Sequence, residues 1–171
     1  MKQLNFLEQC SKTAKPVDDS ATRWQLYIDG ASRNNPGPSG AGVYILKNDQ
    51  LFYAQGFYLG KKTNNEAEYY ALLIGIFICK EAMESSDTVY IASDSQLVIK
   101  QLLGEFQVRK PEIKKLYDAA RILLSDLSYS LCHILREQNS RADLLANKGI
   151  DTHNPLPHDF IAYANEHNIT I

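Results

Sequence analysis

The first third of the chain alternates hydrophobic and polar side chains as a half-buried sheet requires. Between Trp24 and Ile28 every second residue is apolar, which predicts a strand because successive side chains of a strand point to opposite faces. Two more such runs follow at 41–46 and 51–59, and the Asn48-Asp49 pair between them is typical of a hairpin turn. Three strands with short connections predict an antiparallel meander.

The remainder of the chain has mainly helical spacing. Thr63 can cap a helix while Glu66 reaches back to it, and this helix is predicted to run to about Met83. Its predicted buried face consists of Ala67, Tyr70, Ala71, Ile74 and Ile78. Further helices are predicted over 95–103, 111–124 and 140–148, the last ended by Gly149 as a C-cap, with strands over 89–92 and 130–135.

The order of these elements is β-β-β-α-β-α-α-β-α. Helices separate the later strands from the preceding ones, and such crossovers produce parallel neighbours. We therefore predict an α/β fold with a five-stranded mixed sheet, three antiparallel strands then two parallel ones, and helices on both faces.

Length and composition favour one domain with additions at both ends. The 171 residues are 44% hydrophobic and 22% charged, which is typical of a globular protein. Residues 1–22 lack periodicity and are predicted to be a flexible or loosely docked N-terminal extension. The domain is expected over 23–150, followed by a C-terminal tail over 151–171 with one short helix at 159–166.

Charge and cysteine usage indicate the setting. A net charge of -2 and a pI near 6.1 provide no global attraction for nucleic acid, so any polyanion site must be local. Cys10, Cys79 and Cys132 are odd in number and widely spaced, which predicts neither a disulfide framework nor a zinc site and favours a cytoplasmic location. No apolar stretch suits a membrane span or signal peptide.

Four carboxylates occupy comparable places in the predicted fold. Asp29 and Asp94 each follow a strand, and Glu68 and Asp143 lie in the first turns of helices. If the first and fourth strands are parallel neighbours, these acids meet at one sheet edge and repel each other unless Mg²⁺ or Mn²⁺ is bound. Each acid also has a structural alternative, as a turn residue, a cap or a partner of a helix dipole.

Four motifs together resemble type 1 ribonuclease H. They are Asp29-Gly30-Ala31-Ser32 with Asn35-Pro36-Gly37, Thr63-Asn64-Asn65-Glu66-Ala67-Glu68, Ser93-Asp94-Ser95-Gln96 and Asn139 to Asn147, in the family's order. The resemblance covers roughly Trp24 to Ile150. It implies a ribonuclease H fold in the domain. It also implies a metal-dependent endoribonuclease that hydrolyses the RNA strand of an RNA/DNA hybrid and leaves 5′-phosphate and 3′-hydroxyl ends.

The resemblance also assigns roles to residues. It implies that the catalytic, metal-binding set is Asp29, Glu68, Asp94 and Asp143. Two ions, Mg²⁺ or Mn²⁺, would activate the attacking water and stabilise the leaving oxygen, and Glu68 would also touch a ribose 2′-hydroxyl. The positions expected to bind the hybrid are Asn35, Thr63, Asn65 and Gln96. For these four, turn formation or capping remains an equal alternative.

Two features depart from the family pattern. Many members carry a catalytic histidine in the loop before the last helix, but residues 135–139 contain none. Arg136 is the expected substitute, as in an arginine-containing subgroup, although a guanidinium is a poor base. His133 lies within a predicted strand, which favours a structural role. Residues 105–110 are too short for the basic protrusion that some members carry.

Other functions on the same fold remain open at this point. A nucleic-acid-binding module without turnover and a DNA-directed nuclease are the alternatives, because a fold does not determine a function. The expected partner is an RNA/DNA hybrid duplex, with no membrane and no obligate protein partner, and the protein is expected to be a monomer.

Overall fold

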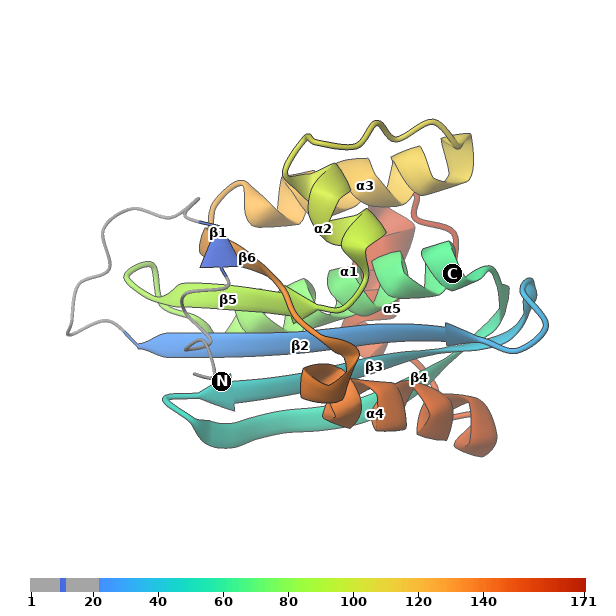
Figure 1. Cartoon of the computed structure of the whole chain (residues 1–171), viewed down its shortest axis with the longest axis horizontal. Helices are drawn as coiled ribbons and strands as arrows, with labels where there is room; N and C mark the ends of the chain where they lie inside the picture. Colours follow the sequence, from blue (N-terminus) through green and yellow to red (C-terminus); the bar gives the residue numbers. More distant parts are fainter. Residues whose placement is uncertain (1–9, 12–21) are drawn as a thin grey trace.

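The computed structural model describes residues 10–11 and 22–171, which build a six-stranded sheet in the order β1-β6-β5-β2-β3-β4 (Figure 1). The strands are β1 (Cys10–Ser11), β2 (Arg23–Ser32), β3 (Gly37–Lys47), β4 (Gln50–Lys62), β5 (Thr88–Ser93) and β6 (Ser128–His133). The meander β2-β3-β4 is antiparallel, and β5 and β6 run parallel to β2. The predicted five-stranded mixed sheet is confirmed, and the short strand β1 is added to it, antiparallel to β6.

Helices cover both faces of this sheet (Figure 1). They are α1 (Asn64–Ala82), α2 (Gln96–Leu102), α3 (Pro111–Leu124), the 3₁₀ helix η2 (Arg136–Asn139), α4 (Ser140–Thr152) and α5 (His158–Glu166). On one face α1 lies on β2 and β3, and α3 packs against α1. α5 joins this layer through Phe160, whose ring centroid lies 5.7 Å from that of Phe77. On the opposite face α4 lies on β3 and β4.

The helix α1 is buried on nearly all sides because it lies between the sheet and the outer helices. The predicted capping box of Thr63 and Glu66 is present at its start. Its predicted buried face was too narrow, since Leu72, Leu73 and Ile76 have no exposed surface, whereas the predicted member Ile78 is only partly buried. A helix with one apolar stripe suits a surface position, whereas a helix covered on two sides is apolar all round.

The predicted end of α4 at Gly149 is wrong. The helix continues to Thr152, and the residue after it, His153, has the left-handed φ of 50°. Gly149 lies inside the helix where α4 crosses β4, and a Cβ atom there would stand 2.5 Å from both the N and the O atoms of Phe57. Glycine is therefore needed here because the helix and the strand approach so closely that a Cβ atom would clash with the strand backbone.

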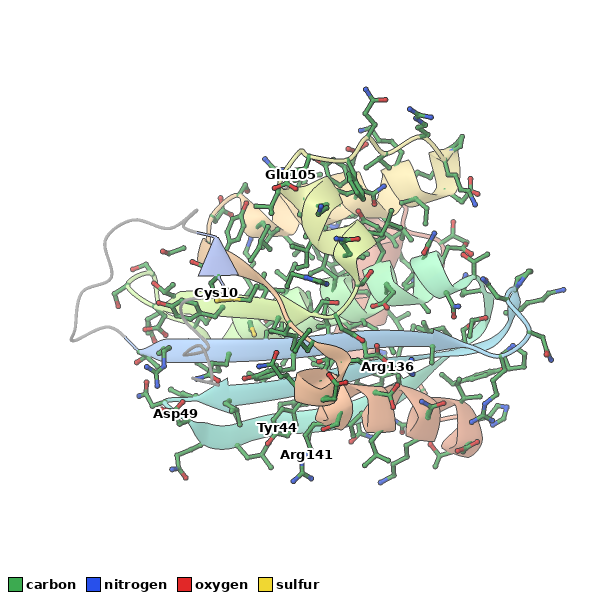
Figure 2. The ribbon with its side chains drawn as sticks, viewed as in Figure 1. Cys10, Tyr44, Asp49, Glu105, Arg136 and Arg141 are labelled. Atoms are coloured by element: carbon green, nitrogen blue, oxygen red, sulfur yellow. A yellow bond between two sulfur atoms is a disulfide. The ribbon has the colours of Figure 1, made fainter. Side chains whose placement is uncertain are left out.

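The prediction about the cysteines is also wrong. Cys10 and Cys132 form a disulfide that joins β1 to β6 (Figure 2). The two residues are 122 positions apart in the sequence, and only the β1-β6 register brings them opposite each other. Cys79 is free and buried, and burial raises the pKa of its thiol to about 12.

The outer segments can be described only in part. Most of the extension predicted over 1–22 lies outside the described residues. In the described ranges, no helix combines the length and the apolar character that crossing a membrane requires. The short helix predicted at 159–166 is present as α5, and Phe160 and Ala164 on it are fully buried.

Candidate active site

Two strands bring carboxylates to one edge of the sheet because their pairing stops just before these residues. β2 and β5 are paired up to Tyr27 and Ala92, and Asp29 and Asp94 each follow two residues later. Beyond this point β2 continues along β3, whereas β5 ends at Ser93. Space therefore opens beyond the carboxyl ends of two parallel strands, where sheets of this kind usually place their sites.

All four predicted carboxylates line one hollow of about 380 Å³ at this edge. Glu68 reaches it from the N-terminal part of α1 and Asp143 from the first turn of α4. The other polar residues that line the hollow are Ser32, Asn64, Asn65, Ser95, Arg136 and Asn147. A larger groove of about 740 Å³ between α1, α3 and the C-terminal residues contains none of the four carboxylates.

Glu68 is held against the end of β2 by a backbone hydrogen bond. The N–H group of Gly30 donates to Oε2 of Glu68 at 3.1 Å. Helix and strand are so close here that a Cβ atom on Gly30 would stand 2.1 Å from the backbone N of Glu68. Glycine at this position therefore places the Glu68 carboxylate beside Asp29.

Two of the structural alternatives for these acids do not hold. The capping box of α1 uses Glu66, and Glu68 is no part of it. The N-cap of α2 is Ser95, whose hydroxyl accepts from the N–H of Val98, and Asp94 precedes this cap. Asp143 does lie in the first turn of its helix, where a carboxylate is favourable.

The site carries more negative charge than its surroundings balance. Burial raises the pKa of Asp29 to about 7, and the carboxylates of Asp94 and Asp143 add to this rise, while Arg136 opposes it. Burial and the carboxylates of Asp29 and Asp94 raise the pKa of Glu68 well above its ordinary value, against the hydrogen bond from Gly30. Such mutual repulsion is what a bound cation relieves.

Arg136 provides only weak compensation. Its Nη2 atom lies 3.5 Å from Oδ1 of Asp143, and its side chain is 80% exposed beside the start of α4 (Figure 2), so solvent screens the pair. Among the described residues, no three Asp, Glu, His or Cys side chains stand close enough to enclose an ion without moving. The donor set is one that suits a hard divalent cation, and such an ion would draw the carboxylates together.

These pKa shifts predict how stability depends on pH when divalent ions are removed by a chelator. The folded protein keeps a proton on Asp29 up to about pH 7, whereas the unfolded chain releases it near pH 4. Stability must therefore fall as pH rises through this window. We expect the free energy of unfolding of the wild type, relative to Asp29→Asn, to fall by about 2–3 kcal/mol between pH 5 and pH 8.

Urea unfolding of both proteins across this pH range measures the effect. The comparison cancels the groups that lie away from the site and leaves the contribution of Asp29, together with that of Glu68, whose pKa the Asp29 carboxylate raises. A difference that is constant with pH, or that changes in favour of the wild type as pH rises, would contradict the assigned environment of this carboxylate.

The residues predicted to bind substrate lie around the hollow at different distances. Asn65 lines it directly. Asn35 accepts a hydrogen bond at its Oδ1 from the N–H of Asn64 at 3.0 Å, which links the β2-β3 loop to the start of α1. Thr63 caps α1, and Gln96 is exposed at the first position of α2.

Sequence reasoning missed one side chain at this site. Asn139, which received no role of its own, is 1% exposed and contacts Asp94. The signal in the sequence, an asparagine just before a helix, predicts an ordinary N-cap. His133 is exposed at the end of β6, and its Nε2 lies 3.3 Å from the backbone O of Asp94.

The sheet order and the acid cluster at the ends of the parallel strands define a ribonuclease H-like protein. The family model described as reverse transcriptase-like matches residues 27–149. Ribonuclease HI of Halobacterium salinarum is 38% identical over 141 residues, covering 81% of this chain and 70% of that protein. The chain therefore belongs to the type 1 ribonuclease H family. It has the ribonuclease H activity of this family.

Solved structures agree with this assignment. The crystal structure of RNase H1 from Halobacterium salinarum matches with a TM-score of 0.72 at 37% identity, covering 76% of this chain and 98% of that one. The structure of LC11-RNase H1 in complex with an RNA/DNA hybrid also matches with a TM-score of 0.72, at 31% identity, covering 75% of this chain and 97% of that one.

Proposed function

We propose that the protein is an endonuclease that hydrolyses the RNA strand of RNA/DNA hybrids and leaves 5′-phosphate and 3′-hydroxyl ends. The observation that carries this proposal is the presence of Asp29, Glu68, Asp94 and Asp143 around one hollow at the sheet edge. A protein that only binds nucleic acid has no use for a group of carboxylates that raises the pKa of Asp29 and Glu68. The hybrid held by the related LC11-RNase H1 supports the substrate class.

We also propose that the four carboxylates hold two divalent ions, Mg²⁺ or Mn²⁺. Oxygen donors from Asp29, Glu68, Asp94 and Asp143 suit such ions, and the unbalanced charge supports their binding. When bound, the ions supply an activated water and stabilisation of the leaving 3′ oxygen. The chain itself contributes the Gly30 N–H group, which orients Glu68, and the guanidinium of Arg136, which offsets part of the charge of Asp143.

The hybrid is proposed to contact the rim of the hollow. Asn65 at its wall and Asn35, Thr63 and Gln96 nearby supply neutral donors and acceptors for sugar and phosphate groups. Residues 103–110 connect α2 to α3 without a helix of their own, so the basic protrusion is absent from this connection. We therefore expect few phosphate contacts, and hence modest affinity that falls with added salt.

Cleavage assays on three duplexes test the proposal. With Mg²⁺ or Mn²⁺, we expect cleavage of the RNA strand of an RNA/DNA hybrid, no comparable cleavage of double-stranded RNA or DNA, and no cleavage in the presence of a chelator. Products are analysed for 5′-phosphate ends. Hybrid binding without metal-stimulated cleavage would instead identify a binding module, and preferred cleavage of double-stranded DNA would identify a DNA-directed nuclease.

Three expectations about the whole protein stay predictions. We propose that residues 23–150 form the catalytic domain between the extension 1–22 and the tail 151–171, which the family match over 27–149 supports. We also propose that the protein is a monomer. A cytoplasmic location is also proposed, but the cysteines no longer support it, because Cys10 and Cys132 are joined.

A further inference from the structure

The side chain of Asn139 joins three parts of the active site through one amide group. Its Nδ2 donates to the backbone O of Ile28 at 2.9 Å and to Oδ1 of Asp94 at 2.7 Å. Ile28 immediately precedes Asp29 on β2, Asp94 follows β5, and Asn139 itself stands four residues before Asp143. A single buried donor group therefore links the segments that carry three of the four carboxylates.

The contacts of Asn139 are not those that stability alone would select. It occupies the N-cap position of α4, yet its side chain makes no capping hydrogen bond, although asparagine is among the best capping residues. Its Oδ1 atom is buried and has no hydrogen-bond partner among the described residues. An unsatisfied buried acceptor destabilises a fold, so both features disfavour the native state.

The orientation of the amide follows from its two partners. The backbone carbonyl of Ile28 can only accept a hydrogen bond, so the NH₂ group of Asn139 must face it, and the same NH₂ group faces the carboxylate of Asp94. The bond to Asp94 is short, as expected for a donor that faces a charged acceptor. It occupies Oδ1 of Asp94 and leaves Oδ2 without a hydrogen bond in the described part of the chain.

We propose that Asn139 is a positioning residue, which fixes the rotation of the Asp94 carboxylate so that its second oxygen is presented to the metal-binding hollow. This inference rests on the proposed function, since it gives Asp94 the role of metal ligand. Groups that orient a ligand in this way typically change metal affinity or activity by about 10- to 100-fold when they are removed.

Manganese binding without nucleic acid provides the first test. Calorimetric titration of Asn139→Ala with Mn²⁺ should give about tenfold weaker binding than the wild type. On the hybrid, kcat should fall by about 10- to 100-fold while KM stays within roughly threefold. The isosteric Asn139→Asp, which replaces the donor with a third acceptor, should lose more of both properties than Asn139→Ala.

The matched control is Asn154→Ala. Asn154 also donates its Nδ2 to a backbone carbonyl, that of Gly56 at 2.8 Å, but away from the hollow. This variant should keep both Mn²⁺ affinity and kcat within about twofold of the wild type. If Asn139→Ala does not fold, Asn139→Leu, which keeps a side chain of similar size without a donor, carries the same comparison.

A double-mutant cycle shows whether Asn139 acts through Asp94. In an Asp94→Asn background, Asn139→Ala should weaken Mn²⁺ binding by no more than about twofold further. A full tenfold loss in that background, or an Asn139→Ala protein that loses thermal stability but keeps Mn²⁺ affinity and kcat, would overturn the proposal. A wild type that binds Mn²⁺ but does not cleave hybrid would refute the proposed function and leave the Mn²⁺ comparison valid.

Discussion

Asp29→Asn is expected to abolish cleavage of the hybrid, with kcat lowered by roughly a thousandfold or more. Asp29 is 7% exposed, and its charge interacts with those of Asp94, Asp143 and Glu68, so its loss removes a charge that affects all the other carboxylates of the proposed metal site. The amide that replaces it is nearly isosteric but neutral, and a neutral oxygen binds a divalent ion far more weakly. Single-turnover cleavage at saturating Mg²⁺ measures the loss.

The loss of activity is not expected to come from unfolding. Because Asp29 is a buried carboxylate with a raised pKa, its neutral replacement should be more stable than the wild type at pH 8 when no divalent ion is present. Asp126→Asn is the control for the removal of one negative charge. Asp126 is 73% exposed and pairs with Lys80, so its loss should change kcat by less than about twofold. Undiminished cleavage by Asp29→Asn would refute the proposed mechanism.

Gly30→Ala is expected to lower stability and activity together. The added Cβ atom would stand 2.1 Å from the backbone N of Glu68 and 2.2 Å from the backbone C of Ala67. Backbone atoms cannot rotate away from such a contact, so α1 must move off β2. We expect a cost of about 3 kcal/mol or more. The same movement displaces Glu68, so cleavage by the folded fraction should fall by roughly a hundredfold.

Gly104→Ala separates this clash from the general effect of replacing a glycine. Gly104 has a φ of +79° and no atom within 4 Å of an added Cβ, so its replacement introduces backbone strain but no clash. The expected cost is about 1 kcal/mol, without a change in cleavage. Denaturant unfolding with cleavage assays of both variants makes the comparison. Equal stability of the two variants would show that the approach of α1 to β2 is looser than described.

Much of the fold could be read from local patterns. Alternation between Trp24 and Ile28 and the capping box of Thr63 with Glu66 each depend on residues close together in the sequence, and both are present in the structure. The helical crossovers predicted that the later strands run parallel to the first, and the structure shows β5 as a parallel neighbour of β2. In this arrangement Asp29 and Asp94 lie at the same edge of the sheet.

Other features depend on contacts between segments that are distant in the sequence. Gly149 has the local signature of a helix end, but the backbone of Phe57 beside it requires a glycine within the helix. Cys10 and Cys132 showed no spacing that predicts a disulfide, because only the β1-β6 register brings them together. Both features arise from contacts between segments that are far apart in the sequence, and neighbouring residues do not determine them.

The sequence by itself determined the order of the elements from Trp24 onward, five strands of the sheet and the positions of the four carboxylates in these elements, because periodicity and the ends of strands are local properties. The tertiary structure alone decided how these carboxylates are held. The N–H of Gly30 on Glu68 and the amide of Asn139 on Asp94 join residues 38 and 45 positions apart. Burial and mutual repulsion, which raise the pKa of Asp29 to about 7, likewise arise only when distant segments meet.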